Sequence, residues 1–370
     1  MQFTIRTGEL LKGLKWVQGI VERKSTMPAL MNVMISTSGK EVVEVIATDL
    51  SISLSGRLQA TVVKAGKLVL NAKRVYEAVS QLPEGDTVIE KLENNWAHIK
   101  CGKVQYKLVG VQAEEFPSIP KPTGTKFFKV KVKNLERMIA KTIYAVSTDE
   151  VRRNLNGVYM ETLEGKKVRM VATDGHRLDM IDSDFGGGDK VDIKGGVIVP
   201  RKGFAEFRKL AAEAGEEVEI GFLPNQIVLN TKDVMISTKL IEGKFPDYTQ
   251  VVPKENDKVV VAGRAAIMDA LRRISILSVE RSNVVMMKLK KGQVEISSTD
   301  PNAGEGSEEL EVDYGGPALE VGLNARYILD ALTAMDSESV RLEIGDELSA
   351  ILVKPEGGEE YTCVVMPVRL

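Results

Sequence analysis

The chain has 370 residues, 43% of them hydrophobic and 28% charged, and a formal net charge of −2. Length and composition are typical of a soluble globular protein with two or three domains, and they exclude a disordered or fibrous chain. The small net charge argues against a simply basic nucleic-acid binder, although the placement of charge matters more than its sum.

The N-terminal segment, the hydropathy and the cysteines indicate a cytoplasmic protein. Segment 1–16 has no uninterrupted apolar core and no small-residue cleavage site, which argues against a secretory signal. No apolar run approaches the roughly 18 residues that span a bilayer. Cys101 and Cys363 stand alone and far apart in the sequence, which favours reduced core thiols over a disulfide.

The first third of the chain predicts a helix, a pair of strands, a second helix and further strands. Apolar residues at helical spacing predict a half-buried helix over 9–24, and alternating strand-like runs follow at 29–38 and 41–49. A further strand leads into a second helix over 71–80, and three more strands close on Phe116-Pro117. This order defines one structural unit.

The same order of elements recurs twice more along the chain. Thr-Asp pairs at 48–49, 173–174 and 299–300 are spaced by 125 and 126 residues, and the elements around each pair correspond. Each unit is therefore an α+β domain whose two helices pack on antiparallel sheets. The further helices are predicted at 134–153, 200–213, 264–281 and 324–336, and the expected bounds of the three tandem domains are 1–124, 125–252 and 253–370.

Charge is unevenly divided between the helices and the rest of the chain. The six predicted helices sum to +7, which leaves −9 for everything else. A positive helical layer on an acidic protein suits a polyanion held against one surface, although solvated helix faces carry lysine and arginine in many other proteins. Aromatic residues make up only 5% of the chain and no helix interleaves them with basic residues. Bound DNA would therefore be contacted through its phosphates without reading of bases.

One segment offers a candidate for catalysis. The chain has two histidines, His98 and His176, and it shows no Cys/His metal cluster, P-loop, dinucleotide fingerprint or nucleophile elbow. Asp174 and His176 could form the acid–base pair of a hydrolase or transferase. We favour a turn with His176 at the edge of a docking groove, because the other repeats carry Thr-Asp-Leu and Thr-Asp-Pro there. A third hypothesis is an interaction scaffold that never meets DNA, and the glycine-rich run at 185–190 is expected to be a flexible loop.

Four motifs and the triple repeat carry a family resemblance. ATDGHRL at 172–178, VPRKG at 199–203, KFPDY at 244–248 and VVMPVRL at 364–370 closely resemble the bacterial DNA polymerase III beta subunit family, the beta sliding clamps. The resemblance runs through the whole chain. It implies a head-to-tail homodimer closed into a ring, with helices inside and sheets outside, because a heterologous interface that closes makes a ring. Such a ring would hold a replication machine on duplex DNA without catalytic activity, cofactor or metal.

The resemblance also implies where the chain binds its partners. A groove between the second and third domains would take short peptide motifs from the DNA polymerase III catalytic subunit, the clamp loader and repair factors. Asn154 and Gln250 stand where some relatives carry bulkier or charged residues, which bears on partner preference. The implied groove residues are Leu155, Thr173, Gly175, His176, Arg177, Leu178, Pro246, Val251, Tyr327, Leu348, Val364, Met366, Pro367, Val368 and Arg369.

The resemblance also implies contacts with DNA and with a second copy of the chain. The implied DNA contacts are Arg23, Lys24, Lys73, Arg74, Arg152, Arg153, Arg201 and Lys202. The implied dimer contacts are Tyr106 and Leu108 on an edge strand and Ile276 and Leu277 at a helix end.

Overall fold

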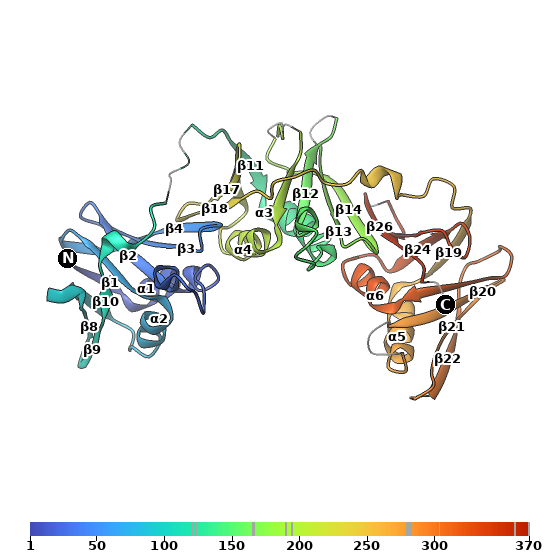
Figure 1. Cartoon of the computed structure of the whole chain (residues 1–370), viewed down its shortest axis with the longest axis horizontal. Coiled ribbons are helices and arrows are strands. Elements are labelled where there is room, and N and C mark those ends of the chain that lie inside the picture. The colour runs from blue at the N-terminus through green and yellow to red at the C-terminus, as the bar shows by residue number, and fades with distance from the viewer. Residues whose placement is uncertain are drawn as a thin grey trace. The chain divides into compact units, whose positions relative to one another are not determined.

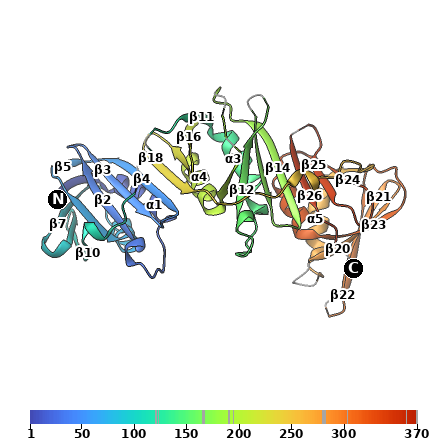
Figure 2. The same ribbon diagram turned by 45° about the horizontal axis from the view of Figure 1, so that its top comes forward.

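The structure is a computed structural model, and it describes residues 1–119, 122, 124–164, 167–188, 191–193, 195–278, 283–302, 304–358 and 360–368. The chain divides into two compact units, whose elements Figures 1 and 2 show from two directions. The N-terminal unit comprises Met1–Lys133, Gly186–Asp189 and Lys202–Leu240, and the C-terminal unit comprises Asn134–Phe185, Lys190–Arg201 and Ile241–Leu370.

The N-terminal unit is built from two antiparallel sheets and the helices that cover them. One sheet has the strand order β5-β1-β7-β8-β9 and the other β10-β6-β2-β3-β4-β18-β17-β16-β11. Helices α1 and α2 pack on each other, and α1 also contacts β3 and β4. The bounds are β1 Gln2–Arg6, α1 Thr7–Val17, β2 Asn32–Ser38, β3 Val42–Thr48, β4 Ile52–Gln59, β5 Thr61–Lys64, β6 Lys67–Asn71, α2 Ala72–Ser80, β7 Asp86–Lys91, β8 Ala97–Cys101, β9 Val104–Leu108, β10 Gly110–Val111, β11 Phe127–Lys131, α4 Arg201–Ala212, β16 Glu217–Leu223, β17 Gln226–Asn230 and β18 Val234–Lys239, with short 3₁₀ turns at Pro28–Met31, Glu93–Asn95 and Ala113–Glu115.

The C-terminal unit repeats this construction. Its sheets have the orders β15-β12-β13-β14-β26-β25-β24-β19 and β22-β21-β20-β23, again antiparallel, and helices α5 and α6 pack on each other. The bounds are α3 Val132–Ala140, β12 Gly157–Thr162, β13 Lys167–Thr173, β14 Arg177–Asp184, β15 Val197–Pro200, β19 Lys258–Gly263, α5 Arg264–Ser275, β20 Val284–Lys290, β21 Gln293–Asp300, β22 Gly304–Glu311, β23 Leu319–Asn324, α6 Ala325–Thr333, β24 Ser339–Ile344, β25 Ile351–Pro355 and β26 Tyr361–Val365, with 3₁₀ turns η4 Ile143–Ala145, η5 Arg153–Leu155 and η6 Tyr248–Gln250.

Consecutive repeats are joined by antiparallel strand pairing. In the N-terminal unit β4 pairs with β18, with Leu54 opposite Ile236, and in the C-terminal unit β14 pairs with β26. Each large sheet therefore draws its strands from two repeats, which explains why the second repeat is divided between the units. The pairing also removes strand edges that would otherwise expose unpaired backbone groups. The predicted fold of three tandem repeats, each with two helices and antiparallel sheets, is confirmed.

The Thr-Asp pairs of the first two repeats stand at hairpin turns with one shared hydrogen-bond pattern, whereas Thr299 and Asp300 end strand β21. Thr48 Oγ1 donates to Ile52 O and accepts from Leu50 N, while Asp49 Oδ1 accepts from Ser51 N and Ile52 N. Thr173 and Asp174 make the same four bonds in the second repeat. Short polar side chains that bond to nearby backbone favour such turns, so the pair recurs for a structural reason.

Three helices end at least six residues earlier than the sequence predicts. The predicted helices 9–24, 134–153 and 264–281 end at Val17, Ala140 and Ser275 respectively. At or just after each helix end, a polar side chain donates to a carbonyl of the last turn: Gln18 to Leu14 O, Thr142 to Met138 O and Ser275 to Arg272 O. Such bonds satisfy terminal carbonyls and compete with continued helix. The prediction that placed Arg23, Lys24, Arg152 and Arg153 on these α-helices was therefore wrong, and Arg153 begins the 3₁₀ turn η5.

The segregation of charge persists with the observed helix bounds. The six α-helices of the described chain carry 14 Lys and Arg residues against six Asp and Glu residues. Within the described residues, none of these helices is long and apolar enough to cross a membrane. Both cysteines are free and buried.

The glycine-rich run at 185–190 is packed over the part that the structure describes. Gly186 forms a β-bridge with Val130, and a Cβ on Gly187 would lie 1.9 Å from Lys129 O. Only glycine permits this approach of two backbones. Gly186 and Gly187 are therefore packed against β11, whereas positions 189 and 190 lie outside the described residues.

Candidate functional site

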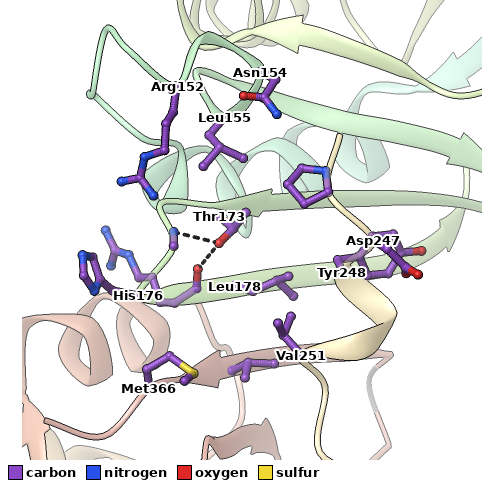
Figure 3. Close-up of a pocket in the computed structure, with 14 residues that line it drawn as sticks. Arg152, Asn154, Leu155, Thr173, His176, Leu178, Asp247, Tyr248, Val251 and Met366 are labelled. Atoms are coloured by element: carbon purple, nitrogen blue, oxygen red, sulfur yellow. Dashed lines mark hydrogen bonds between the residues drawn. The ribbon is translucent and has the colours of Figure 1, made fainter. Parts of the chain in front are cut away.

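The C-terminal unit contains a groove with a volume of about 490 Å³. Its walls come from the loop before β12, the hairpin between β13 and β14, the segment around η6, and the end of β26 (Figure 3). These segments lie far apart in the sequence and converge because β14 pairs with β26. The lining residues are Arg152, Asn154, Leu155, Thr173, Gly175, His176, Arg177, Leu178, Pro246, Asp247, Tyr248, Val251, Val364 and Met366.

The floor of the groove is apolar. Leu155, Leu178 and Val364 are buried and belong to one hydrophobic cluster, and the register of β14 and β26 places Leu178 opposite Val364. Val251 and Met366 stand at the mouth, with 48% and 43% of their surface exposed. Exposed large apolar side chains over a buried apolar floor are typical of a surface that binds a partner's apolar side chains.

The β13–β14 hairpin forms one rigid wall. Thr173 Oγ1 donates to Arg177 O at 2.6 Å and accepts from Gly175 N at 3.0 Å, as the dashed lines of Figure 3 show. Gly175 has φ +93°, and a Cβ there would lie 2.6 Å from Arg152 Nη1. The left-handed backbone therefore favours glycine, and the Arg152 guanidinium would have to shift to admit a Cβ.

Arg177 is held inside the protein rather than offered to a ligand. Its side chain is 8% exposed and forms ion pairs with Asp174 at 3.1 Å and Asp330 at 2.7 Å. The guanidinium carbon lies 5.1 Å from the ring centroid of Tyr144 and 4.7 Å from that of Tyr327. Burial acts to lower the pKa of Arg177, but its hydrogen bond to Asp330 and the nearby carboxylates raise it overall. Arg177 therefore supports the groove wall as a permanent cation.

The same network positions His176. The His176 and Tyr327 rings are stacked, with centroids 6.4 Å apart and an interplanar angle of 16°. Asp174 is committed to the backbone N–H groups of His176 and Arg177 and to the Arg177 guanidinium. Its carboxylate thus supports the turn, which leaves the hypothesis of an Asp174–His176 acid–base pair without geometric support.

A buried polar cluster lies on the other face of the same strands. Asp179 follows Leu178 and is 1% exposed, and it accepts hydrogen bonds from Tyr361 at 3.1 Å and from Tyr144. Burial raises the pKa of Asp179 to about 6. Burial likewise raises the pKa of the neighbouring Cys363 thiol and of both tyrosines. Alternation along a strand sends Leu178 to the groove and Asp179 away from it.

The structure brings together ten of the predicted groove residues and leaves the others aside. Tyr327 contacts the site through its stack with His176, and Leu348 is 57% exposed on a loop outside the lining. Pro367 and Val368 follow β26 without lining the groove, and Val368 N donates to Gly322 O. Arg369 lies outside the described residues. The ten lining residues are Leu155, Thr173, Gly175, His176, Arg177, Leu178, Pro246, Val251, Val364 and Met366.

Four lining residues were absent from the predicted groove set. Arg152, predicted to contact DNA, bonds to Asp149 and to the carbonyl of Asp174 and so ties its loop to the hairpin. Asn154 donates to Lys244 O at 3.1 Å, while Asp247 caps η6. Tyr248 donates to Glu161, and burial raises its pKa to about 12. All four lie within three residues of a predicted groove residue in the sequence, which is the signal that could have found them.

The remaining predicted contacts lie on exposed elements of their own units. Lys73 and Arg74 begin α2, whereas Lys202 in α4 forms an ion pair with Asp49 and donates to Ile20 O. Arg23, Lys24, Arg153 and Arg201 are also exposed. Tyr106 and Leu108 lie on β9, one of the two edge strands of the five-stranded sheet. Ile276 is 78% exposed, and Leu277 follows it directly after α5. The described residues contain no group of His, Cys, Asp and Glu that could hold a metal ion.

Comparison with known proteins decides the family. The DNA polymerase III beta subunit family matches with its N-terminal domain at 1–120, its central domain at 129–247 and its C-terminal domain at 249–369. The beta sliding clamp of Pseudomonas putida is 34% identical, with all of both chains covered. The chain belongs to the DNA polymerase III beta subunit family.

Solved structures of beta clamps agree with this assignment. The Pseudomonas aeruginosa DNA polymerase III subunit beta has a TM-score of 0.94 at 34% identity, with both chains fully covered. The Caulobacter crescentus beta sliding clamp also has a TM-score of 0.94 at 34% identity and full coverage, and it carries PEG at what is described as a beta-motif tethering region. Beta clamps are non-catalytic processivity factors of DNA polymerase III, so the hydrolase or transferase hypothesis is wrong for this chain.

Proposed function

We propose that this beta clamp closes head to tail with a second copy into a ring around duplex DNA. In the ring it tethers the DNA polymerase III catalytic subunit, the clamp loader and other proteins that carry a clamp-binding motif. The proposal includes the domain bounds 1–124, 125–252 and 253–370 and a cytoplasmic location. Family membership supports the ring, and the groove at the β14–β26 junction supports the tether.

The groove is the observation that carries the tethering function. An apolar floor of Leu155, Leu178 and Val364 lies beneath an exposed rim of Val251 and Met366. An extended peptide with two or more large apolar side chains fits this chemistry, and the polar hairpin can orient its backbone. Binding through a short peptide also allows many partners to share one site in turn.

DNA would be held by charge without base recognition. The helices carry a clear excess of basic over acidic residues, and Lys73 and Arg74 are exposed in the first turn of α2. Exposed lysine and arginine contact phosphates of any sequence, and each contact is weakened by salt. Such contacts permit sliding, which a tether on DNA requires. For Lys202, the ion pair with Asp49 must open before it can reach a phosphate.

Retention on closed and opened DNA tests the ring. Labelled protein is loaded by its clamp loader onto a nicked circular plasmid, and the complex is separated by gel filtration in high salt. We expect retention on the circle and loss after a single restriction cut, because a ring is held by topology. Equal retention on circular and linear DNA would contradict the topological mechanism. Removing residues 366–370 should abolish binding of the polymerase catalytic subunit and leave the dimer intact; loss of the dimer would show that the groove is misplaced.

A further inference from the structure

A second hollow adjoins the groove in the C-terminal unit. Its volume is about 950 Å³, and it shares Val251 and Met366 with the groove, whose volume is about 490 Å³. The walls are formed by segment 249–257 and by the loop between β24 and β25, including Gly345, Asp346, Ser349 and Ala350. Because the two hollows share their rim residues, a chain that leaves the groove across Val251 and Met366 enters the second hollow.

The wall of this hollow is polar and mainly acidic. Its charged side chains are Glu255, Asp257 and Asp346 against Lys254. Asp257 is paired with Lys258 at 2.8 Å, whereas in the described part of the chain no salt bridge reaches Glu255 or Asp346. The hollow therefore presents two carboxylates without a salt-bridge partner among the described residues, although the positive charge of Lys258 also acts on Asp346.

Asp346 is kept anionic and in place by its own loop. Its Oδ1 accepts the backbone N–H groups of Leu348 at 2.8 Å and Ser349 at 2.6 Å. A side-chain hydrogen bond from Ser349, together with these N–H groups, lowers the pKa of Asp346. A carboxylate stabilised in this way remains charged at neutral pH and can attract a cationic group.

The hollow is built before any partner arrives. Asn256 Nδ2 donates to Glu343 O at 2.8 Å and to Ala350 O at 2.9 Å, which pins segment 249–257 to the β24–β25 loop. Lys258 Nζ adds a bond to Gly345 O at 2.6 Å. A preformed wall costs little ordering entropy when a ligand binds, so even modest contacts there contribute to affinity.

We infer that this hollow receives the residues that flank the apolar motif of a bound partner peptide, and that it selects lysine or arginine among them. The inference rests on the proposed peptide-binding function of the groove. Continuity through Val251 and Met366 supplies the path, and Glu255 and Asp346 supply the charge. Peptides with the same apolar motif would thus be ranked by their flanking charge, which gives partners that share one groove different affinities.

Flanking-charge variants of one peptide test the inference. Overlapping 12-residue peptides of the DNA polymerase III catalytic subunit are screened by fluorescence anisotropy, and the tightest binder becomes the core peptide. The core peptide is then extended at either end by two lysines, two serines or two glutamates. We expect the lysine extension at one end to lower Kd about 3- to 10-fold relative to serine at low salt. The glutamate extension should raise Kd, and the difference should shrink in 0.5 M salt because the charges are exposed.

Variants of the protein assign the effect to the hollow. Glu255→Gln with Asp346→Asn should remove the lysine preference while binding of the core peptide stays within about twofold. Glu347→Gln is the matched control, because Glu347 is an exposed acid beside Asp346 that does not line the hollow. Equal affinities for the lysine and glutamate extensions at both ends, or a preference that survives the double substitution, would overturn the inference alone. Failure of every unextended peptide to bind would overturn the proposed groove function and this inference with it.

Discussion

Leu178 on β14 lies directly opposite Val364 on β26, in the antiparallel pair that joins the second repeat to the third. Both side chains are buried in the floor of the groove. The strand pair that joins the second repeat to the third therefore also forms the floor of the groove. Any change that separates these strands removes the site, whereas changes at the rim can alter binding and leave the fold intact.

Replacing Met366 tests the rim. Met366→Ala should weaken binding of the core peptide about 5- to 10-fold, because a large apolar contact at the mouth of the groove is lost. Met366 is 43% exposed, so the free energy of unfolding should fall by less than about 1 kcal/mol. Anisotropy titration and urea denaturation measure the two effects. Val151→Ala is the control, since Val151 is 89% exposed and does not line the groove; an equal loss of affinity there would assign the effect to something other than the groove.

Replacing Ile276 tests the proposed dimer interface. Ile276→Glu should raise the dimer dissociation constant at least about 10-fold, because a buried apolar contact would be replaced by an unpaired charge. Circular dichroism should stay unchanged, since Ile276 is 78% exposed within one chain. Sedimentation velocity across a dilution series measures the shift. Val63→Glu, at a position 69% exposed on another edge strand, should leave the dimer unaffected. If both variants remain fully dimeric, the interface lies elsewhere.

In the first two Thr-Asp hairpins, introducing a glycine at Leu50 and removing the glycine at Gly175 should change the free energy of unfolding in opposite directions. Leu50 stands at the position of Gly175 and has φ +72°, which is strained for a residue with a Cβ. Leu50→Gly should raise the free energy of unfolding by up to about 1 kcal/mol. Gly175→Ala should lower it by about 1–2 kcal/mol, since the backbone has φ +93° and Arg152 must move. Urea midpoints that shift in the same direction for both variants would contradict this reading.

The buried carboxyl group of Asp179 should make the protein less stable as pH rises through the acidic range, the opposite of the usual effect of a carboxylate. Burial raises the pKa of Asp179 to about 6, above its ordinary value of 3.8. The folded chain then binds this proton more tightly than the unfolded chain, so the contribution of Asp179 to stability falls as pH rises from about 4 to 6 and is level above that. As pH rises from about 4 to 6, the free energy of unfolding of the parent should therefore fall by about 2–3 kcal/mol relative to that of Asp179→Asn, which lacks the titrating carboxyl group. Urea titrations at pH 4.5, 5.5 and 7 measure it. A difference independent of pH would show that Asp179 titrates normally.

Local patterns in the sequence were sufficient to predict the threefold repeat, the order of helices and strands, and the fold class. Helical spacing in 71–80 and 200–213 matches α2 and α4 closely, because a half-buried helix must place apolar residues on one side. The Thr-Asp pair recurs in the first two repeats because its side chains bond to the backbone of their own turn, a local interaction that needs no distant partner. The ends of α1, α3 and α5 were missed, since single side-chain bonds to terminal carbonyls leave no periodic signal.

Only the tertiary structure decided which residues form the site and what each one does there. Leu155, Leu178 and Val364 meet because the sheet crosses from one repeat to the next, a pairing between strands more than 180 residues apart that no local pattern records. Arg177 and Arg152 carry the same charge, yet one is enclosed between two tyrosine rings and the other ties a loop to the hairpin. The sequence by itself determined the three repeats and the motif that ends in Leu178. Burial and long-range strand pairing, which depend on the whole folded chain, determined the groove and the acidic hollow beside it.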